Sequence, residues 1–121
     1  DQPGQGTRTG SGRRTPPAAI LDTLRVVAED PGREWTTAQL AAHADVGVTS
    51  FTSWCRRATG RSPRWFILEQ RVERARELLH TTGMSVTEIA LETGFSSSQH
   101  LSSAFRRLTG STPTEHRRGR P

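Results

Sequence analysis

Hydrophobic side chains recur at helical intervals from Pro17 onward, and no stretch alternates polar and apolar residues as a strand would. Ile20, Leu24 and Val27 follow the i, i+4, i+7 spacing of a helix face, before an Asp-Pro-Gly turn at 30–32. The pattern predicts an all-α fold. Seven helices are expected, over 17–29, 37–43, 48–59, 63–80, 86–92, 97–109 and 113–118.

Polar residues at the expected helix starts support these bounds. Three pairs have the spacing of a capping box, in which two side chains satisfy free N–H groups of the first turn: Thr36 with Gln39, Ser85 with Glu88, and Thr112 with Glu115. Ser96 precedes Gln99 by the same interval, so Ser96 is expected to cap the sixth helix.

The first segment differs in composition from the rest of the chain. Residues 1–15 contain four glycines, two arginine clusters and almost no apolar side chain. Such a segment cannot bury enough surface to offset the entropy of ordering. We therefore expect a flexible linker or tail over 1–16 and a folded domain over 17–121, with either an upstream domain or a cloning remnant explaining the linker.

An internal repeat is the most informative feature. Residues 36–66 resemble residues 85–116, most clearly where Arg-Arg-Ala-Thr-Gly at 56–60 matches Arg-Arg-Leu-Thr-Gly at 106–110. Each copy predicts a short helix, a tight turn and a longer helix, which is a helix-turn-helix. Gly94 suits the turn because glycine tolerates a positive φ, and Asp45 takes that position in the first copy. The predicted units are 36–60 and 85–110, joined by a linker helix over 63–80.

The motifs of the second copy and the linker resemble the DNA-binding domain of the AraC/XylS family of bacterial transcription regulators. They are Ile89-Ala90, Gly94-Phe95-Ser96, Phe105-Arg106-Arg107, Gly110, Thr112-Pro113, and Arg71 followed by Ala75 and Leu78-Leu79. The first copy departs from the family pattern at Asp45, Gly47 and Cys55. The resemblance implies a tandem, homeodomain-like fold, two recognition helices in successive major grooves of double-stranded DNA, RNA polymerase as a partner, and a separate N-terminal sensor or dimerisation domain.

Two helix faces are the candidate base-contacting surfaces. The apolar sides of the third and sixth helices are expected to pack inward, through Phe51, Trp54, Cys55 and Ala58, and through Leu101, Ala104, Phe105 and Leu108. The resemblance implies that the opposite faces contact bases, through Thr49, Thr52, Ser53 and Arg56, and through Ser98, Gln99, His100, Ser102, Ser103 and Arg106. Glutamine can pair with adenine, and arginine with guanine, through two hydrogen bonds. A polar face exposed only to solvent is the alternative interpretation.

The charge distribution indicates the phosphate-contacting residues. The net charge of +5 suits a polyanionic partner. Residues 47–66 contain four arginines and no acid, and residues 96–121 contain five arginines against Glu115. The predicted phosphate contacts are Arg57, Arg61, Arg64, Ser96 and Arg107.

The linker helix sets the distance between the two units. A helix over 63–80 would be about 27 Å long, close to one turn of DNA at ~34 Å. One chain would then contact two adjacent major grooves, and its DNA site would be asymmetric.

Two other functional classes can be compared with the sequence. An enzyme would need a nucleophile such as Cys55, but this cysteine falls on an apolar stripe, and the four histidines lack the spacing of a zinc site. No catalytic residue, metal or cofactor is therefore expected. A helical protein-interaction module is the alternative function, with Trp35, Trp54 and Trp65 as contact residues.

Cellular location follows from what the chain lacks. No apolar run approaches the ~20 residues that span a bilayer, and the start of the chain has no apolar secretion segment. A single cysteine fits a reducing compartment. We expect a cytoplasmic, nucleoid-associated protein that does not contact a membrane.

Overall fold

The computed structural model describes residues 15–119, and almost all of the predicted tail over 1–16 lies outside the described residues. This part of the chain contains helices only, so the all-α prediction is confirmed. Every predicted helix is present, and each predicted bound agrees to within one residue. The helices are α1 (Ala18–Glu29), α2 (Thr37–His43), α3 (Val48–Thr59), α4 (Pro63–Thr81), α5 (Val86–Glu92), α6 (Ser98–Thr109) and α7 (Pro113–Gly119).

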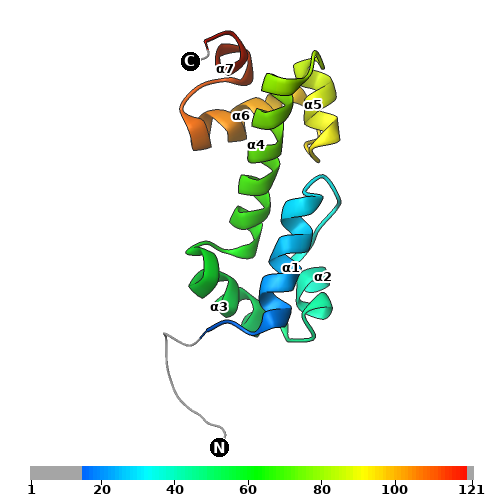
Figure 1. Cartoon of the computed structure of the whole chain (residues 1–121), viewed down its shortest axis with the longest axis vertical. Helices are drawn as coiled ribbons and strands as arrows, with labels where there is room; N and C mark the ends of the chain where they lie inside the picture. The colour runs from blue at the N-terminus through cyan, green and yellow to red at the C-terminus, as the bar shows by residue number, and fades with distance from the viewer. Residues whose placement is uncertain (1–14, 120–121) are drawn as a thin grey trace, which may run out of the picture.

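Helix α4 runs through both halves of the molecule and joins two three-helix lobes (Figure 1). Lobe 1 holds α1, α2 and α3, and its core includes Ile20, Leu40 and Phe51, with Ile67 supplied by α4. Lobe 2 holds α5, α6 and α7, and its core includes Phe105. The second half of α4 supplies Val72, Ala75, Leu78 and Leu79 to this second core. One helix thus belongs to both cores, which ties the lobes together.

The two lobes repeat the same hydrogen bonds at the end of their longer helix. Thr59 Oγ1 donates to the carbonyl oxygen of Cys55 at 2.8 Å, and Thr109 Oγ1 donates to that of Phe105 at 2.8 Å. The next residues, Gly60 and Gly110, have φ of 80° and 88°, a left-handed conformation that glycine adopts without strain. The Thr-Gly pair in each copy therefore ends its helix in the same way.

The turns inside the two helix-turn-helix units also match. Asp45 has a φ of 59° and Gly94 a φ of 92°, as the repeat predicted for this position. Each turn contains an equivalent backbone bond, from Val46 N–H to the carbonyl oxygen of Ala41 at 3.0 Å and from Phe95 N–H to that of residue 90 at 2.8 Å. Asp45 accepts the left-handed conformation that Gly94 adopts more easily.

Two local predictions were wrong. Ser97, not Ser96, caps α6: Ser97 has extended backbone angles, and its Oγ accepts a 3.1 Å hydrogen bond from the N–H of His100. Ala58 was expected in the core but is exposed, whereas its counterpart Leu108 packs against the core of lobe 2. The methyl group of alanine is too short to reach the core from the last turn of the helix.

Candidate nucleic-acid interface

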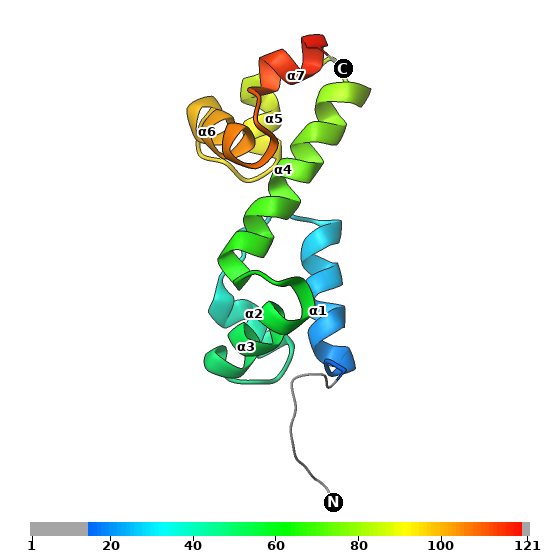
Figure 2. The same ribbon diagram turned by 90° about the vertical axis from the view of Figure 1, so that its left-hand side faces the viewer.

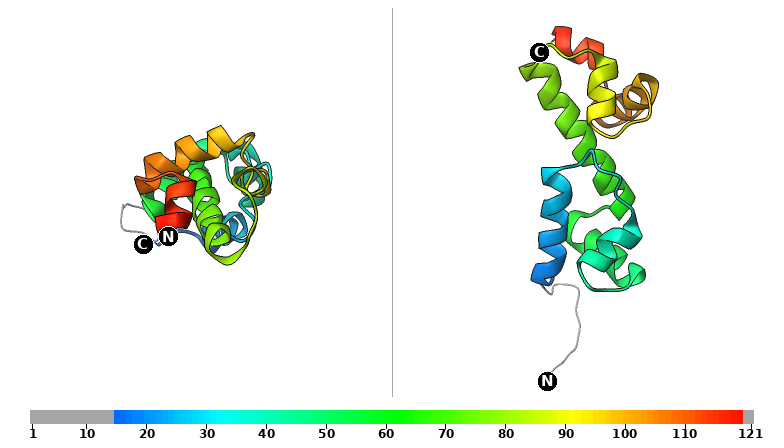
Figure 3. Two further views of the ribbon diagram at one scale, coloured as in Figure 1. Left: turned by 90° about the horizontal axis from the view of Figure 1, so that it is seen from above. Right: turned by 90° about the vertical axis from the view of Figure 1, so that its right-hand side faces the viewer.

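The two longer helices of the repeat lie toward the same side of the molecule. Figure 2 and the right-hand view of Figure 3 show α6 and the α2–α3 pair toward one side and α1 toward the other. A flat or gently curved partner can therefore meet α3 and α6 together.

Helix α3 presents the polar face that the sequence predicted. Thr49, Ser53 and Arg56 are exposed and Thr52 is half-buried, while Phe51 and Cys55 on the opposite face are fully buried. The buried pair anchors the helix in lobe 1, so the polar face is held outward by core packing.

Helix α6 presents the equivalent face in lobe 2. Gln99, Ser103 and Arg106 are exposed, and Ser98 and Ser102 are half-buried. The inward side chains are fully or largely buried: Leu101, Ala104 and Phe105. Because Ser97 provides the cap, Gln99 is not needed to close the start of the helix.

His100 is held in a defined orientation at the start of α6. Its Nδ1 lies 3.3 Å from Ser96 Oγ, and its ring meets the edge of the Phe95 ring at a centroid distance of 5.2 Å. Phe95 is buried, so it anchors the imidazole from below. Ser96, predicted to contact phosphate, is therefore placed beside His100 rather than at the helix cap.

Three of the predicted phosphate-contacting arginines stack on tryptophan rings. Arg57 lies over Trp54 at 5.3 Å, and Arg61 and Arg107 lie over Trp65 at 5.4 and 5.8 Å. Arg61 also lies 3.6 Å from Glu69. Exposed contacts of this kind are worth only about 0.5–1 kcal/mol, so they orient a guanidinium group and leave donors for a ligand.

A hollow of about 600 Å³ lies between the two lobes. Its lining brings together Arg64 from the start of α4 with His100 and Arg107 from α6, and it contains no acidic residue. Trp35, Ser62, Trp65, Ile67, Leu68 and Arg71 complete the lining. Three residues predicted to contact DNA, one from α4 and two from α6, thus line the same basic hollow.

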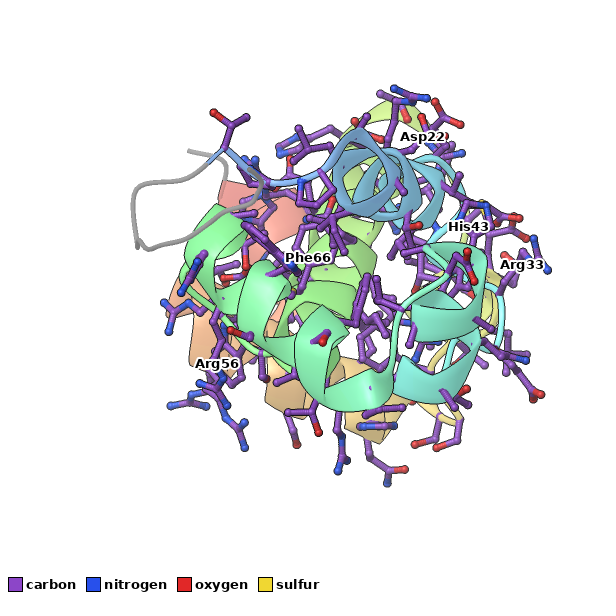
Figure 4. The ribbon with its side chains drawn as sticks, turned by 90° about the horizontal axis from the view of Figure 1, so that it is seen from below. Asp22, Arg33, His43, Arg56 and Phe66 are labelled. Carbon is purple, nitrogen blue, oxygen red and sulfur yellow. The ribbon has the colours of Figure 1, made fainter. Side chains whose placement is uncertain are left out.

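Several acidic side chains pair with arginines outside this surface, whereas Glu69 lies beside Arg61. Asp22 and Glu29 on α1 pair with Arg25, and Glu73 pairs with Arg76 on the exposed side of α4. In Figure 4, Arg56 projects on the side where α6 lies, and Asp22 projects on the opposite side. Asp22 and Arg56 therefore lie on opposite sides of the molecule, in line with the charge asymmetry predicted from the sequence.

The tryptophans are partly packed into the protein. Trp35 and Trp54 pack against the core of lobe 1, and the Trp35 indole N–H donates to the carbonyl oxygen of Asp30 at 2.9 Å. The indole N–H of Trp65 donates to Glu69 at 3.1 Å. These rings support neighbouring helices and arginines rather than forming a free aromatic patch.

The single cysteine lies in the core of lobe 1. Cys55 is fully buried, and this burial raises the pKa of its thiol, although Thr59 and Arg56 act in the opposite direction. Among residues 15–119, no three or more His, Cys, Asp or Glu side chains are grouped to hold a metal ion. No helix in the same range is long and apolar enough to cross a membrane.

One residue of the candidate interface was not identified from the sequence. Val48 is the first residue of α3 and one of only three large hydrophobic residues exposed in residues 15–119, at 48%. It precedes Thr52 by four positions and the buried Cys55 by seven, so it lies at the border between the predicted base contacts and the core-facing side of the helix. That i, i+4 spacing was available in the sequence.

Comparison with known proteins gives a consistent picture. Residues 40–119 match the model of a family described as a helix-turn-helix domain. The HTH-type transcriptional regulator ExsA of Pseudomonas aeruginosa is 36% identical over 87 residues, which cover 72% of this chain and 31% of ExsA. The chain therefore spans less than a third of the length of this relative.

Two solved structures share the fold. One is the DNA-binding domain of AdpA in complex with a target DNA, with a TM-score of 0.79 and 32% identity over 82% of this chain and 89% of that one. The other is an AraC-type regulator from Chromobacterium violaceum, with a TM-score of 0.77 and 27% identity over 85% of this chain and 95% of that one.

Proposed function

The chain belongs to the AraC/XylS family of helix-turn-helix transcription regulators, and from this membership we propose that it binds one DNA site with α3 and α6 in successive major grooves. The observation that carries the proposal is the placement of two exposed polar helix faces on one side of the molecule, with an acid-free basic hollow between them.

Base contacts are assigned to the outward faces of the two recognition helices. In α3 the contacts come from Thr49, Thr52, Ser53 and Arg56, and in α6 from Ser98, Gln99, His100, Ser102, Ser103 and Arg106. Arg56 and Arg106 each occupy the C-terminal part of a recognition helix, where a guanidinium can pair with guanine. The short Ser and Thr side chains require close docking, which favours contacts with thymine methyl groups and with groove shape.

Phosphate contacts are assigned to the residues around and between these faces. The DNA strand that crosses from one groove to the next lies over the hollow, where Arg64 and Arg107 neutralise its phosphates. Arg57, Arg61 and Ser96 contact the flanking phosphates. The tryptophan rings beneath three of the arginines hold their guanidinium groups toward the DNA.

The wider role follows from the family. The chain acts as a regulator and not as an enzyme, in the cytoplasm on nucleoid DNA, and it works with RNA polymerase. The DNA-binding domain works together with a separate N-terminal sensor or dimerisation domain. The larger size of ExsA, of which this chain spans 31%, supports the further domain.

Selection of bound sequences from a random DNA library, followed by footprinting, tests the proposal. We expect a continuous, asymmetric site of roughly two helical turns bound by one chain. If about six to eight phosphates are neutralised, log K against log salt should have a slope of about −5 to −7. A flat salt dependence or absence of binding at low salt would instead favour a protein-interaction module, and a palindrome occupied by two chains would overturn the two-groove arrangement.

A further inference from the structure

The side chain of Arg71 connects the two lobes through backbone carbonyl groups. Its Nε donates to the oxygen of Pro31 at 2.8 Å and one terminal nitrogen donates to that of Arg33 at 2.8 Å, both in the loop that joins α1 to α2 of lobe 1. The other terminal nitrogen donates to the oxygen of Gly94 at 3.3 Å, in the turn of lobe 2. One guanidinium group therefore bonds three carbonyl oxygens from both sides of the lobe boundary.

The two backbone segments around Arg71 approach so closely that each needs a glycine. A Cβ atom at Gly32 would lie 2.4 Å from the carbonyl oxygen of Glu92 in lobe 2. A Cβ atom at Gly94 would lie 2.8 Å from Arg71 Nε and 3.2 Å from the carbonyl oxygen of Gly32. The first two distances are shorter than real Cβ contacts, and the third is tighter than most of them, so the lobes touch backbone to backbone at this point.

The contact lies next to the start of the second recognition helix, α6. Gly94 lies in the turn before α6, which begins at Ser98, and the loop at 30–33 belongs to the lobe that holds α3. Any change in the bonds of Arg71 would therefore change the position of α6 relative to α3. A guanidinium group has donors in a fixed planar arrangement, which suits three acceptors of fixed position.

We propose that Arg71 is a positioning residue that fixes the distance and orientation between α3 and α6, and so determines how many base pairs separate the two parts of the DNA site. This inference rests on the proposed function, because it takes both helices to contact DNA. Arg71 does not need to touch the DNA itself.

A rival role for Arg71 is its charge, because the residue also lines the basic hollow. Substitution with lysine separates the two roles. Arg71→Lys keeps the positive charge but lacks the planar guanidinium group that can donate to three carbonyl groups in different directions. Arg74→Ala is the matched control, since Arg74 lies on the same helix and is exposed, and its carboxylate partner is Glu77 on α4 itself.

The DNA test uses the selected site together with two altered sites, in which one base pair is added or removed between the two halves. Wild-type protein and Arg74→Ala should lose about tenfold or more in affinity on the altered sites, because a rigid pair of helices cannot meet both grooves. Arg71→Lys and Arg71→Ala should lose less than about threefold, because their lobes can adjust. Gly32→Ala, which disrupts the same contact from lobe 1, should behave like them.

Two outcomes would overturn the proposal. In one, Arg71→Lys keeps the wild-type spacing preference while Arg71→Ala only binds more weakly, which assigns Arg71 a role through charge. In the other, ¹⁵N relaxation of the free wild-type protein shows the two lobes tumbling independently. The relaxation measurement needs no DNA and no variant, so independent tumbling would overturn the proposal even if the variants unfold. If wild-type protein binds no DNA but tumbles as one body, the proposed function fails and the rigid contact stands.

Discussion

The buried hydroxyl group of Thr23 joins α1 to α2 by accepting a hydrogen bond from the imidazole of His43. The two atoms, Thr23 Oγ1 and His43 Nδ1, are 2.6 Å apart. The Thr23 hydroxyl has one proton, which it donates to the carbonyl oxygen of Ala19 at 2.8 Å. The imidazole must therefore be the donor, so the Nδ1-protonated form of His43 is the one that fits lobe 1.

Substitution Thr23→Val should destabilise lobe 1 by about 0.5–1.5 kcal/mol. Valine has nearly the same shape, so the change removes the hydrogen bonds without opening a cavity. Urea denaturation measures the loss, and a double-mutant cycle with His43→Ala isolates the bond between helices. Thr93→Val is the control, because the equally buried Thr93 hydroxyl bonds only carbonyl groups of its own helix. Finding His43 protonated at Nε2 alone by ¹⁵N NMR would contradict the assignment.

A second prediction concerns pH and the last helix. The N–H of Thr112 donates to Glu115 Oε1 at 2.9 Å, and the N–H of Glu115 donates to Thr112 Oγ1 at 3.1 Å. The backbone bond from Thr112, and after it the side chain of Thr112, lower the pKa of the Glu115 carboxyl below its ordinary value. A carboxyl with a lowered pKa in the folded state stabilises that state above its unfolded pKa, and the benefit is lost as pH falls through the folded pKa.

The start of α7 should therefore loosen at acid pH, in the range below the ordinary glutamate pKa. NMR titration of the Thr112 amide and the Glu115 side chain measures this change directly. Glu115→Gln keeps a hydrogen-bond acceptor but does not titrate, so this variant should show no acid-induced change at the same amides. An unshifted titration of Glu115 in the wild-type protein would contradict the capping role of its carboxylate.

Helix positions were predictable from the sequence because the caps are explicit and local. Thr36 with Gln39 and Ser85 with Glu88 form both bonds of a capping box, as their spacing indicated. The cap of α6 was not predictable, because residues 96–98 are three consecutive serines with equal capping ability. Which serine caps the helix depends on where the buried Phe95 places the chain, and that is a tertiary effect.

The candidate site was also predictable only in part from the sequence. The outward faces of α3 and α6 follow from helical periodicity, which a sequence displays. The basic hollow and the contacts of Arg71 do not, because Arg71 bonds the carbonyl groups of residues 40 and 23 positions away. Backbone carbonyl groups are present at every residue, so no side-chain pattern marks these acceptors.

The third prediction separates base contact from helix capping in α6. Gln99→Ala should cost about 1–3 kcal/mol on the selected DNA site and relax the base preference at one position. Ser97→Ala should instead lower the free energy of unfolding by about 0.5–2 kcal/mol, because Ser97 caps the helix, and leave base preference unchanged. Binding to single-base variants of the site, measured beside thermal unfolding, distinguishes the two. A uniform loss of affinity for Gln99→Ala on all sequences would show that the helix enters the groove in another orientation.

The last prediction assigns Val48 a contact with a thymine methyl group. Its side chain is 48% exposed at the start of α3, beside the predicted base contacts. Contact of this apolar side chain with water does not stabilise the folded protein. Replacing the contacted thymine with deoxyuridine removes one methyl group, worth about 0.8 kcal/mol, and should weaken wild-type binding several-fold. Val48→Ala should bind both DNAs equally, because the partner of the methyl group is gone.

Leu91→Ala is the matched control, since Leu91 is 62% exposed but lies on α5, and this variant should keep the wild-type response to deoxyuridine. A series of duplexes with each thymine of the selected site replaced in turn locates the contact. If no replacement affects the wild-type protein, or if Val48→Ala responds as the wild type does at every position, Val48 does not contact a thymine methyl group.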